Sequence, residues 1–316
     1  MVKVKIAILF PGQGAQSIGM GKDLYEHYNE SKEIFEKANR ILDWDIQEVC
    51  FEDAHGIINQ TRYTQAALFT TNIAAYEALK ARGIKGEAVL GFSLGEYSAI
   101  TASGVLPFAE TLKLVEKRAG YMEQCASNHP GGMSAVIGLE IDKIDEICKK
   151  VTQETGVVEI ANDNCPGQVT LSGVKEALES ASILLKEAGA KRVLPLQVSG
   201  AFHSSLMQEA ANALKEELGA VAFNEAELPL ISNVTAKGAG KKEIIENIPL
   251  QIVKGVRFRE SILYLIEQGF DTFIEVGTKR TLCNLVKKIS NEVTVMHVED
   301  SSTLEQVIQT IGGEVC

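Results

Sequence analysis

The fold is decided by one short stretch of the sequence, Ala88-Val89-Leu90-Gly91-Phe92-Ser93-Leu94-Gly95. Its first four residues are apolar and predict a buried strand, and a helical pattern begins at Glu96. Gly91 and Gly95 lie two residues either side of Ser93, which matches the pattern G-x-S-x-G. A sharp strand-to-helix turn holds such a serine in a strained conformation, and only glycines let the backbone pass so closely. The stretch therefore predicts a nucleophilic serine, although an ordinary glycine-rich turn is the simpler alternative.

An acyl-transfer serine also needs donors for the oxyanion that forms when it attacks a carbonyl. The turn aims the backbone N–H of Leu94 at the space above Ser93. A second donor is the N–H of Gln13, which lies in the turn Phe10-Pro11-Gly12-Gln13-Gly14 after the first apolar strand. A tight turn without function is the alternative there. A dinucleotide loop is disfavoured, because Ser17 stands where the third glycine is required.

The serine needs a base, and the chain has only five histidines. His203 lies in Val198-Ser199-Gly200-Ala201-Phe202-His203-Ser204-Ser205, at a predicted loop-to-helix junction. The other four fall in charged stretches, in a Pro/Gly linker or in a late strand, so His203 is the predicted general base. A plain surface histidine is the alternative. No carboxylate can be chosen as a third member of the site, since Asp271 and Glu275 both remain open.

Arg118 is a charged residue at a position where its predicted helix is apolar. It lies three residues after Val115 and four after Leu114, so it falls on or beside the apolar face of the helix predicted from Pro107 to Cys125. Such an arginine either pairs with an internal carboxylate or is reserved for the carboxylate of a substrate.

Strands alternate with helices along most of the chain, which predicts a parallel sheet covered on both faces. From Met133 to about Gln197 the order is strand, helix, strand, strand, helix, strand, the ferredoxin-like βαββαβ pattern. We therefore predict an α/β fold in two parts. Residues 1–129 and 198–316 form a large α/β-hydrolase-like subdomain with a parallel sheet, and residues 130–197 form an inserted ferredoxin-like subdomain.

Composition excludes several classes of function. The 316 residues carry a net charge of −11, which disfavours nucleic acid and anionic membranes as partners because both need a basic face. No apolar run is long enough to span a membrane, and no signal peptide is recognisable. The six cysteines are scattered, with no CxxC motif and no Cys/His cluster. We expect a cytoplasmic enzyme with reduced cysteines and no metal site.

Taken together, these motifs resemble those of the malonyl-CoA:acyl carrier protein transacylases. The resemblance runs from about residue 4 to residue 300 and rests on six motifs in the family's order. They are Phe10-Pro11-Gly12-Gln13-Gly14, the segment Gly91–Ala99, Arg118, Asn162-x-Asn164-x-Pro166-Gly167-Gln168, Phe202-His203 and Glu275-Val276-Gly277.

The resemblance implies a two-step transfer of malonyl from malonyl-CoA to the phosphopantetheine thiol of acyl carrier protein, through a malonyl-serine at Ser93. By the same resemblance, this transfer supplies fatty acid chain elongation. The resemblance also implies no permanently bound cofactor and a monomer. By the same resemblance, Arg118 grips the malonyl carboxylate, and the backbone carbonyl of Gln251 orients His203. Asn162 and Phe202 line the cleft, Phe202 in the version associated with malonyl selection.

The sequence departs from the family at three positions: Phe92 replaces histidine, Gly255 replaces proline, and Thr278 replaces proline. Three alternatives stay open. A malonyl-selective acyltransferase of polyketide synthesis would look the same, a serine hydrolase would use the same turn, and a non-catalytic carrier-binding module would not need Ser93 and His203.

An acidic carrier protein would be repelled by a chain of net charge −11 unless the docking face is locally basic. Two basic segments lie near the cleft by analogy with the family. They are Lys191-Arg192 at the end of the small unit, and Lys279-Arg280 with Lys287-Lys288 on a late helix. We predict docking at Lys191, Arg192, Lys287 and Lys288, with ordinary solvated side chains as the alternative.

Overall fold

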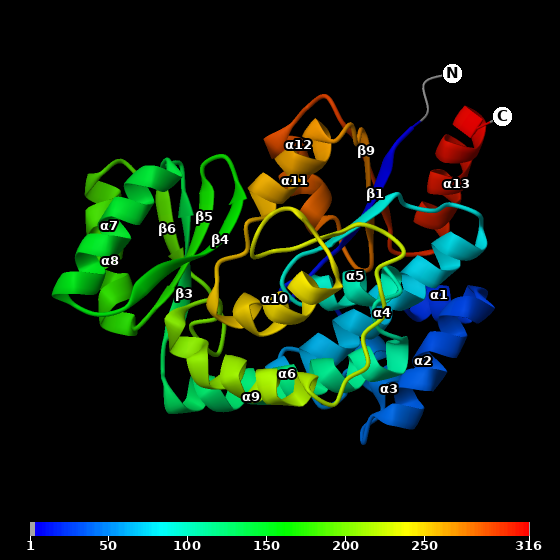
Figure 1. The fold of residues 1–316 in the computed structure, drawn as a ribbon, viewed down its shortest axis with the longest axis horizontal. Helices are drawn as coiled ribbons and strands as arrows, with labels where there is room; N and C mark the ends of the chain where they lie inside the picture. Colours follow the sequence, from blue (N-terminus) through cyan, green and yellow to red (C-terminus); the bar gives the residue numbers. More distant parts are fainter. Residues whose placement is uncertain (1–3, 316) are drawn as a thin grey trace.

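The computed structural model describes residues 4–315, so Cys316 lies outside the described residues. The larger of its two sheets has six strands, five of them parallel, and β8 antiparallel to β7 at one edge (Figure 1). In the order of the sheet they are β10 (Thr294–Val298), β9 (Thr272–Val276), β1 (Ile6–Phe10), β2 (Ala88–Gly91), β7 (Leu230–Ile231) and β8 (Gly238–Ala239).

The central strand β1 is buried on both faces, which explains its continuous apolar sequence. Ile8 and Phe10 join one hydrophobic core, and Ala7 and Leu9 join another on the opposite face. Helices cover both faces and fill the connections. They are α1 (Lys22–His27), α2 (Asn29–Ile41), α3 (Ile46–Phe51), α4 (Thr61–Ala81), α5 (Gly95–Ala102), α6 (Phe108–Asn128), η1 (Ser205–Met207), α9 (Gln208–Leu218), α10 (Lys241–Val253), α11 (Phe258–Glu267), α12 (Thr281–Ile289) and α13 (Ser301–Val315).

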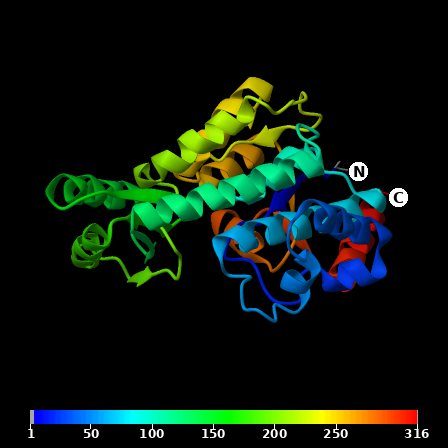
Figure 2. The same cartoon turned by 90° about the horizontal axis from the view of Figure 1, so that it is seen from below.

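The second sheet has four antiparallel strands in the order β4-β5-β3-β6. It is built from β3 (Gly132–Ile137), α7 (Ile141–Glu154), β4 (Val158–Cys165), β5 (Gln168–Gly173), α8 (Lys175–Glu187) and β6 (Arg192–Pro195). The two helices pack on one face and share a separate hydrophobic core with the strands. Figure 2 shows α6 running across the molecule toward this sheet. The mixed α/β architecture with a parallel-rich sheet is thus confirmed.

Several expectations about single elements need correction. Helix α10 was not predicted, since Pro249 lies inside it and proline normally ends a helical pattern. The late helix starts at Thr281 rather than at Lys279, whose φ of 64° is not helical. Strand β7 is short, with only the two residues Leu230 and Ile231. None of the helices among residues 4–315 combines the length and apolar composition that a membrane span requires.

Candidate active site

Ser93 lies in the turn between β2 and α5, as the G-x-S-x-G pattern predicts. Its φ of 53° is in the left-handed region, where a residue with a side chain is strained. A Cβ on Gly91 would lie 1.8 Å from the carbonyl carbon of Gly95, and a Cβ on Gly95 would lie 2.0 Å from the carbonyl oxygen of Phe10. The two glycines are therefore required sterically. The Ser93 N–H donates to Asn233 Oδ1 at 2.8 Å, which fixes the turn.

His203 is buried directly beside the serine, with 2.7 Å between its Nε2 and Ser93 Oγ. Its Nδ1 lies 2.7 Å from the backbone carbonyl of Gln251. A carbonyl oxygen only accepts, so Nδ1 carries the proton and the lone pair of Nε2 faces the serine hydroxyl. Burial, and then the charge of Arg118, lower the pKa of His203 to about 4. The imidazole is neutral at neutral pH, as a base must be.

Gln251 joins the main groups of the site through its side chain as well as its carbonyl. Its Nε2 donates to the Ser93 carbonyl at 2.7 Å and to Glu96 Oε2 at 2.6 Å, and its Oε1 accepts from Arg118 at 2.9 Å. The family resemblance implied a role for the carbonyl alone, and the network of the side chain was not predicted. Its one sequence signal was Glu96, a charged residue in the first turn of a helix that is otherwise apolar or small.

Glu96 is buried, and its burial raises the pKa of the carboxyl group to about 7. One oxygen accepts from the Asn233 N–H at 3.0 Å, and the other accepts from Gln251. Asn233 in turn donates from Nδ2 to the Gly91 carbonyl at 2.6 Å. These bonds tie the nucleophile's turn to the start of the segment after β7 and to α10.

Arg118 is 1% exposed on α6, which confirms its expected place on the apolar side of that helix. Its guanidinium donates to Gln65 Oε1 at 2.6 Å, to Gln251 Oε1 at 2.9 Å and to Ser93 Oγ at 3.3 Å. No carboxylate of the described residues lies within salt-bridge distance of it, and its Nε has no partner. Burial lowers the pKa of Arg118. Arg118 thus makes no direct ion pair with the described residues, although the charge of the buried Glu96, which shares Gln251 with it, acts on the guanidinium.

The loop that carries Gln13, one of the two predicted oxyanion donors, passes close to the turn that carries Ser93 and Leu94. A Cβ on Gly12 would lie 2.2 Å from the carbonyl oxygen of Phe92, so the loop after β1 reaches the turn only because residue 12 is glycine. Neither the N–H of Gln13 nor that of Leu94 donates to another residue in the described part of the chain. Their role as oxyanion donors stays a prediction.

A cavity of about 270 Å³ opens over the serine. Its lining includes the side chains of Ser93, His203, Arg118, Asn162 and Phe202, together with Gln13. Asn162 is buried and its Oδ1 has no hydrogen-bond partner among the described residues. An unpartnered buried amide oxygen at a cavity wall is a candidate contact for a ligand. The expected grouping of cleft residues is thus found in space.

The three departures from the family pattern have local explanations. Phe92 packs its ring against Phe258, with 5.5 Å between the ring centroids. A Cβ on Gly255 would lie 2.6 Å from the carbonyl oxygen of Ile160, so the chain passes too close there for a side chain without a shift. Thr278 is buried, and its hydroxyl pairs with Ser17 Oγ at 3.2 Å and with Glu299 at 3.2 Å.

The carboxylates left open as third members are not part of the site. Glu275 accepts from the backbone N–H groups of Leu282 and Cys283 at the start of α12, and Asp271 accepts from the Lys5 N–H. One expectation about the remaining polar residues also needs correction. The sequence search found no Cys/His cluster, but the structure brings Cys125, His129 and Glu209 together.

The four predicted docking residues are exposed, but they do not behave alike. Lys288 Nζ donates to Gln168 Oε1 at 3.1 Å, and Gln168 lines the cavity. Arg192 lies in register with Ile137, which in turn pairs with Gln168, so these side chains share one face of the small sheet. Lys287 instead donates to the Val293 carbonyl at 2.6 Å, away from the cavity.

Comparison with known proteins agrees with this geometry. Residues 8–307 match the family of acyl transferase domains. This chain belongs to the acyl transferase family. This acyltransferase is similar to the malonyl CoA-acyl carrier protein transacylase of Bacillus subtilis (strain 168). The two sequences are 43% identical over 311 residues, and the alignment covers 98% of each chain.

Solved acyltransferase structures are similar over the same length. The malonyl CoA-acyl carrier protein transacylase of Clostridium perfringens superposes with a TM-score of 0.95 at 41% identity, covering 98% of each chain. A malonyl-transacylase solved in complex with a type II PKS acyl-carrier protein superposes with a TM-score of 0.93 at 34% identity, covering 97% of this chain and 99% of that one.

Proposed function

We propose that this acyltransferase moves the malonyl group of malonyl-CoA to the phosphopantetheine thiol of an acyl carrier protein, through a malonyl ester on Ser93. One observation carries the choice of acyl group: the buried guanidinium of Arg118 lies 3.3 Å from the nucleophile and has no carboxylate partner in the described chain. The names of the relatives support the same substrate and acceptor.

In the first half-reaction, Ser93 Oγ attacks the thioester carbonyl while His203 Nε2 takes its proton. The 2.7 Å contact and the lowered pKa of the imidazole support this role. The oxyanion of the tetrahedral intermediate accepts from the N–H groups of Gln13 and Leu94. The C–S bond then breaks, and His203 returns the proton to the leaving thiolate of coenzyme A.

In the second half-reaction, the carrier's thiol replaces coenzyme A in the cavity. His203 accepts the thiol proton, the sulfur attacks the malonyl-serine carbonyl, and the same two N–H groups bind the oxyanion. Collapse breaks the bond to Ser93 Oγ, which recovers its proton from His203. The carbonyl of Gln251 keeps Nδ1 protonated throughout, so the base returns in the same tautomer.

Arg118 supplies selectivity in this scheme. A malonyl carboxylate lies two bonds from the carbonyl that Ser93 attacks, so a guanidinium 3.3 Å from Oγ is close enough to hold it by two parallel hydrogen bonds. An acetyl group would leave a buried charge unpaired, which disfavours it. Asn162 and Phe202 line the same cavity, and we assign them to contacts with the acyl and thioester groups.

We further propose that the two sheets belong to two subdomains, residues 1–129 with 198–316 and residues 130–197. The parallel strands, the turn at Ser93 and the helices on both faces support an α/β-hydrolase-like assignment for the first. The order β4-β5-β3-β6, with β3 and β5 in the centre, supports a ferredoxin-like assignment for the second. The monomeric state implied by the resemblance stays a prediction.

For the carrier, we propose docking at Lys191, Arg192, Lys287 and Lys288, beside the cavity mouth. The shared face of Arg192 and Gln168, and the contact from Lys288 to Gln168, support this placement. Lys287 contributes least, because its amine is bound to Val293. Substituting Lys191→Glu with Arg192→Glu should raise the KM for the carrier in a salt-dependent way and leave loading from malonyl-CoA unchanged.

The function is tested by incubating the purified chain with malonyl-CoA and a phosphopantetheinylated carrier protein. Malonyl-carrier should form at a rate that depends on both substrates, and Ser93→Ala should abolish it. Release of free malonate at the same rate with or without carrier would indicate a hydrolase instead. Turnover of neither kind would contradict both enzymatic assignments.

A further inference from the structure

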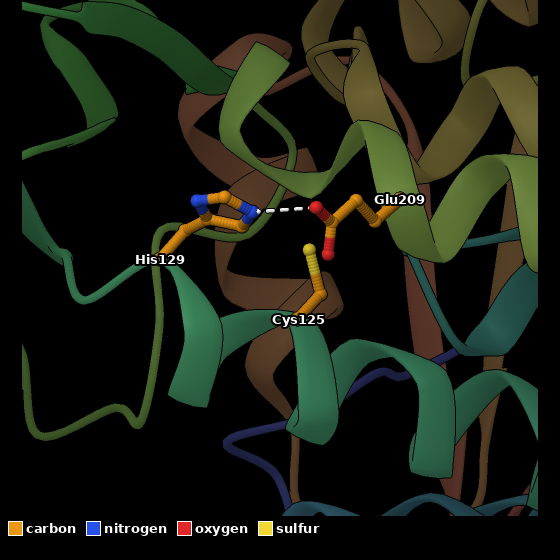
Figure 3. Close-up of side chains that lie close together, drawn as sticks. All are labelled: Cys125, His129 and Glu209. Carbon is orange, nitrogen blue, oxygen red and sulfur yellow. Dashed lines mark ion pairs between the residues drawn. The ribbon is translucent and has the colours of Figure 1, made fainter.

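Outside the active site, three potential metal ligands point toward one another where α6 ends and α9 begins (Figure 3). Cys125 Sγ, His129 Nε2 and a Glu209 carboxylate oxygen all lie within 4.8 Å of one another. His129 Nε2 is 3.0 Å from Glu209 Oε1. Among the residues whose side chains the structure describes, 4–311, this is the one such group of three, and the proposed mechanism uses none of its members.

The secondary structure explains why these side chains converge. Cys125 lies in the last turn of α6, and His129 is the residue that follows the helix, held there by a bond from its N–H to the Cys125 carbonyl. Glu209 lies in the first turn of α9, which packs against α6. Two further contacts orient the group: Cys125 Sγ lies 3.3 Å from the Leu206 carbonyl, and Asn128 Nδ2 donates to Glu209 Oε2 at 3.4 Å.

We propose that Cys125, His129 and Glu209 form a binding site for a borderline-soft divalent ion of the Zn²⁺ class. Thiolate, imidazole and carboxylate are the three ligand types that Zn²⁺ takes in proteins. One thiolate and one carboxylate balance the charge of the ion. His129 and Glu209 are 42% and 60% exposed, so water has access to a fourth position.

Binding requires only small movements. Ligand bonds of about 2.0–2.3 Å place the donor atoms of a tetrahedral site roughly 3.5 Å apart. Since the donor atoms now lie within 4.8 Å of one another, no pair must approach by more than about 1.3 Å. Rotation of the exposed His129 and Glu209 side chains supplies this. As the Zn–S bond forms, the Cys125 thiol gives up its hydrogen bond to the Leu206 carbonyl and loses its proton to the solvent. The His129–Glu209 hydrogen bond is replaced by two bonds to the ion.

The site has a structural consequence because of its place in the chain. Helix α6 carries Arg118, and η1 and α9 follow directly after His203. An ion held by Cys125 and Glu209 would link the end of α6 to the start of α9. Since the unfolded chain does not preform the site, the bound ion stabilises the folded state.

The test titrates the reduced, chelator-stripped full-length chain with Zn²⁺, and separately with Co²⁺ to detect a thiolate-to-metal absorption band. We expect one ion per chain and a Tm that rises with Zn²⁺ concentration. Cys125→Ser should abolish the Co²⁺ band, and both Cys125→Ser and His129→Asn should weaken Zn²⁺ binding at least tenfold. Serine keeps a donor toward the Leu206 carbonyl, and residue 129 is exposed, so both variants should fold.

The chain offers matched controls for both substitutions. Like His129, His27 pairs with a carboxylate: its Nδ1 lies 3.4 Å from Asp23 Oδ2, on the same helix α1. No described cysteine adds a third potential metal ligand there. His27→Asn and Cys148→Ser should therefore bind Zn²⁺ like the parent chain. Unchanged affinity in Cys125→Ser, absence of a Co²⁺–thiolate band in the parent, or equal losses in the controls would overturn the proposal.

Discussion

Replacing Arg118 should change which acyl group the enzyme accepts more than it changes the enzyme's ability to acylate Ser93. The side chain donates to the amide oxygens of Gln65 and Gln251 and to Ser93 Oγ, and it meets no carboxylate in the described chain. Arg118→Ala removes the proposed partner of the malonyl carboxylate. Arg118→Lys keeps a positive charge but not the planar pair of donors.

The expected magnitude follows from the burial of the pair. Removing one partner of a buried, hydrogen-bonded ion pair costs about 3–5 kcal/mol. Each 1.36 kcal/mol is a factor of ten, so Arg118→Ala should lower kcat/KM for malonyl-CoA by between about 100-fold and several thousand-fold. Acetyl-CoA has no carboxylate to lose, and its kcat/KM should change by less than about tenfold. In Arg118→Lys, the loss of kcat/KM for malonyl-CoA should be smaller than in Arg118→Ala but still larger than the change for acetyl-CoA.

The assay is rapid-quench measurement of Ser93 acylation with malonyl-CoA and with acetyl-CoA in parallel. Lys117→Ala is the matched control, because Lys117 precedes Arg118 on α6 but is exposed and pairs with Glu217. It should leave both rates unchanged. Equal losses for malonyl and acetyl groups in Arg118→Ala would refute the carboxylate role and would indicate a general structural role instead.

Three further predictions concern the base, the network and the turn. The rate of Ser93 acylation should stay constant as the pH falls from 8 to about 5, and it should halve near pH 4, where folded His203 gains its proton. A rate that already halves near pH 6.5 would show that burial does not lower the pKa of His203. Because unfolded histidine is protonated first, the contribution of His203 to the free energy of unfolding should fall by up to about 3 kcal/mol between pH 6.5 and 4. The buried carboxyls of Glu96 and Glu275, whose pKa is raised to about 7, act in the opposite direction over this range, so the contribution is measured as the difference between the parent chain and His203→Gln in chemical denaturation. Glu96→Ala should lower kcat by about tenfold or more, since Gln251 loses an acceptor. Glu96→Gln should recover only part of it in the same assay, because one amide oxygen replaces the two carboxylate oxygens that accept from Gln251 and from the Asn233 N–H. Gly95→Ala should destabilise the chain by at least about 3 kcal/mol in urea unfolding, whereas Gly120→Ala, with open space around its Cβ, should stabilise it by about 0.5–1 kcal/mol.

The parts of the fold that the sequence predicted are those with strong local signals. The apolar run before Ser93, the glycines around it and the strand–helix alternation each depend on neighbours in the chain. Helix α10 was missed because Pro249 interrupts its pattern, yet the packing of Ile244, Ile248 and Ile252 holds the helix together. Tertiary burial there outweighs the local signal.

The candidate site likewise contains residues with a local sequence signal and residues that only tertiary contacts bring into place. Ser93 and His203 were predicted from their local contexts. The fold brings their side chains within hydrogen-bond distance, although the two residues are 110 positions apart in the sequence. Glu96, Asn233 and the side chain of Gln251 were not found, because their roles depend on contacts between distant segments that no spacing in the sequence records. Cys125 and His129 carried a four-residue spacing, but the third ligand came from another helix.

The most direct test of the central claim is intact mass spectrometry of the chain after brief exposure to malonyl-CoA, with and without carrier protein. The account predicts one malonyl adduct per chain, mapped by peptide analysis to Ser93, absent in Ser93→Ala and transferred to the carrier's thiol when carrier is added. An adduct on another residue, or malonyl-carrier formed while Ser93→Ala remains fully active, would contradict it.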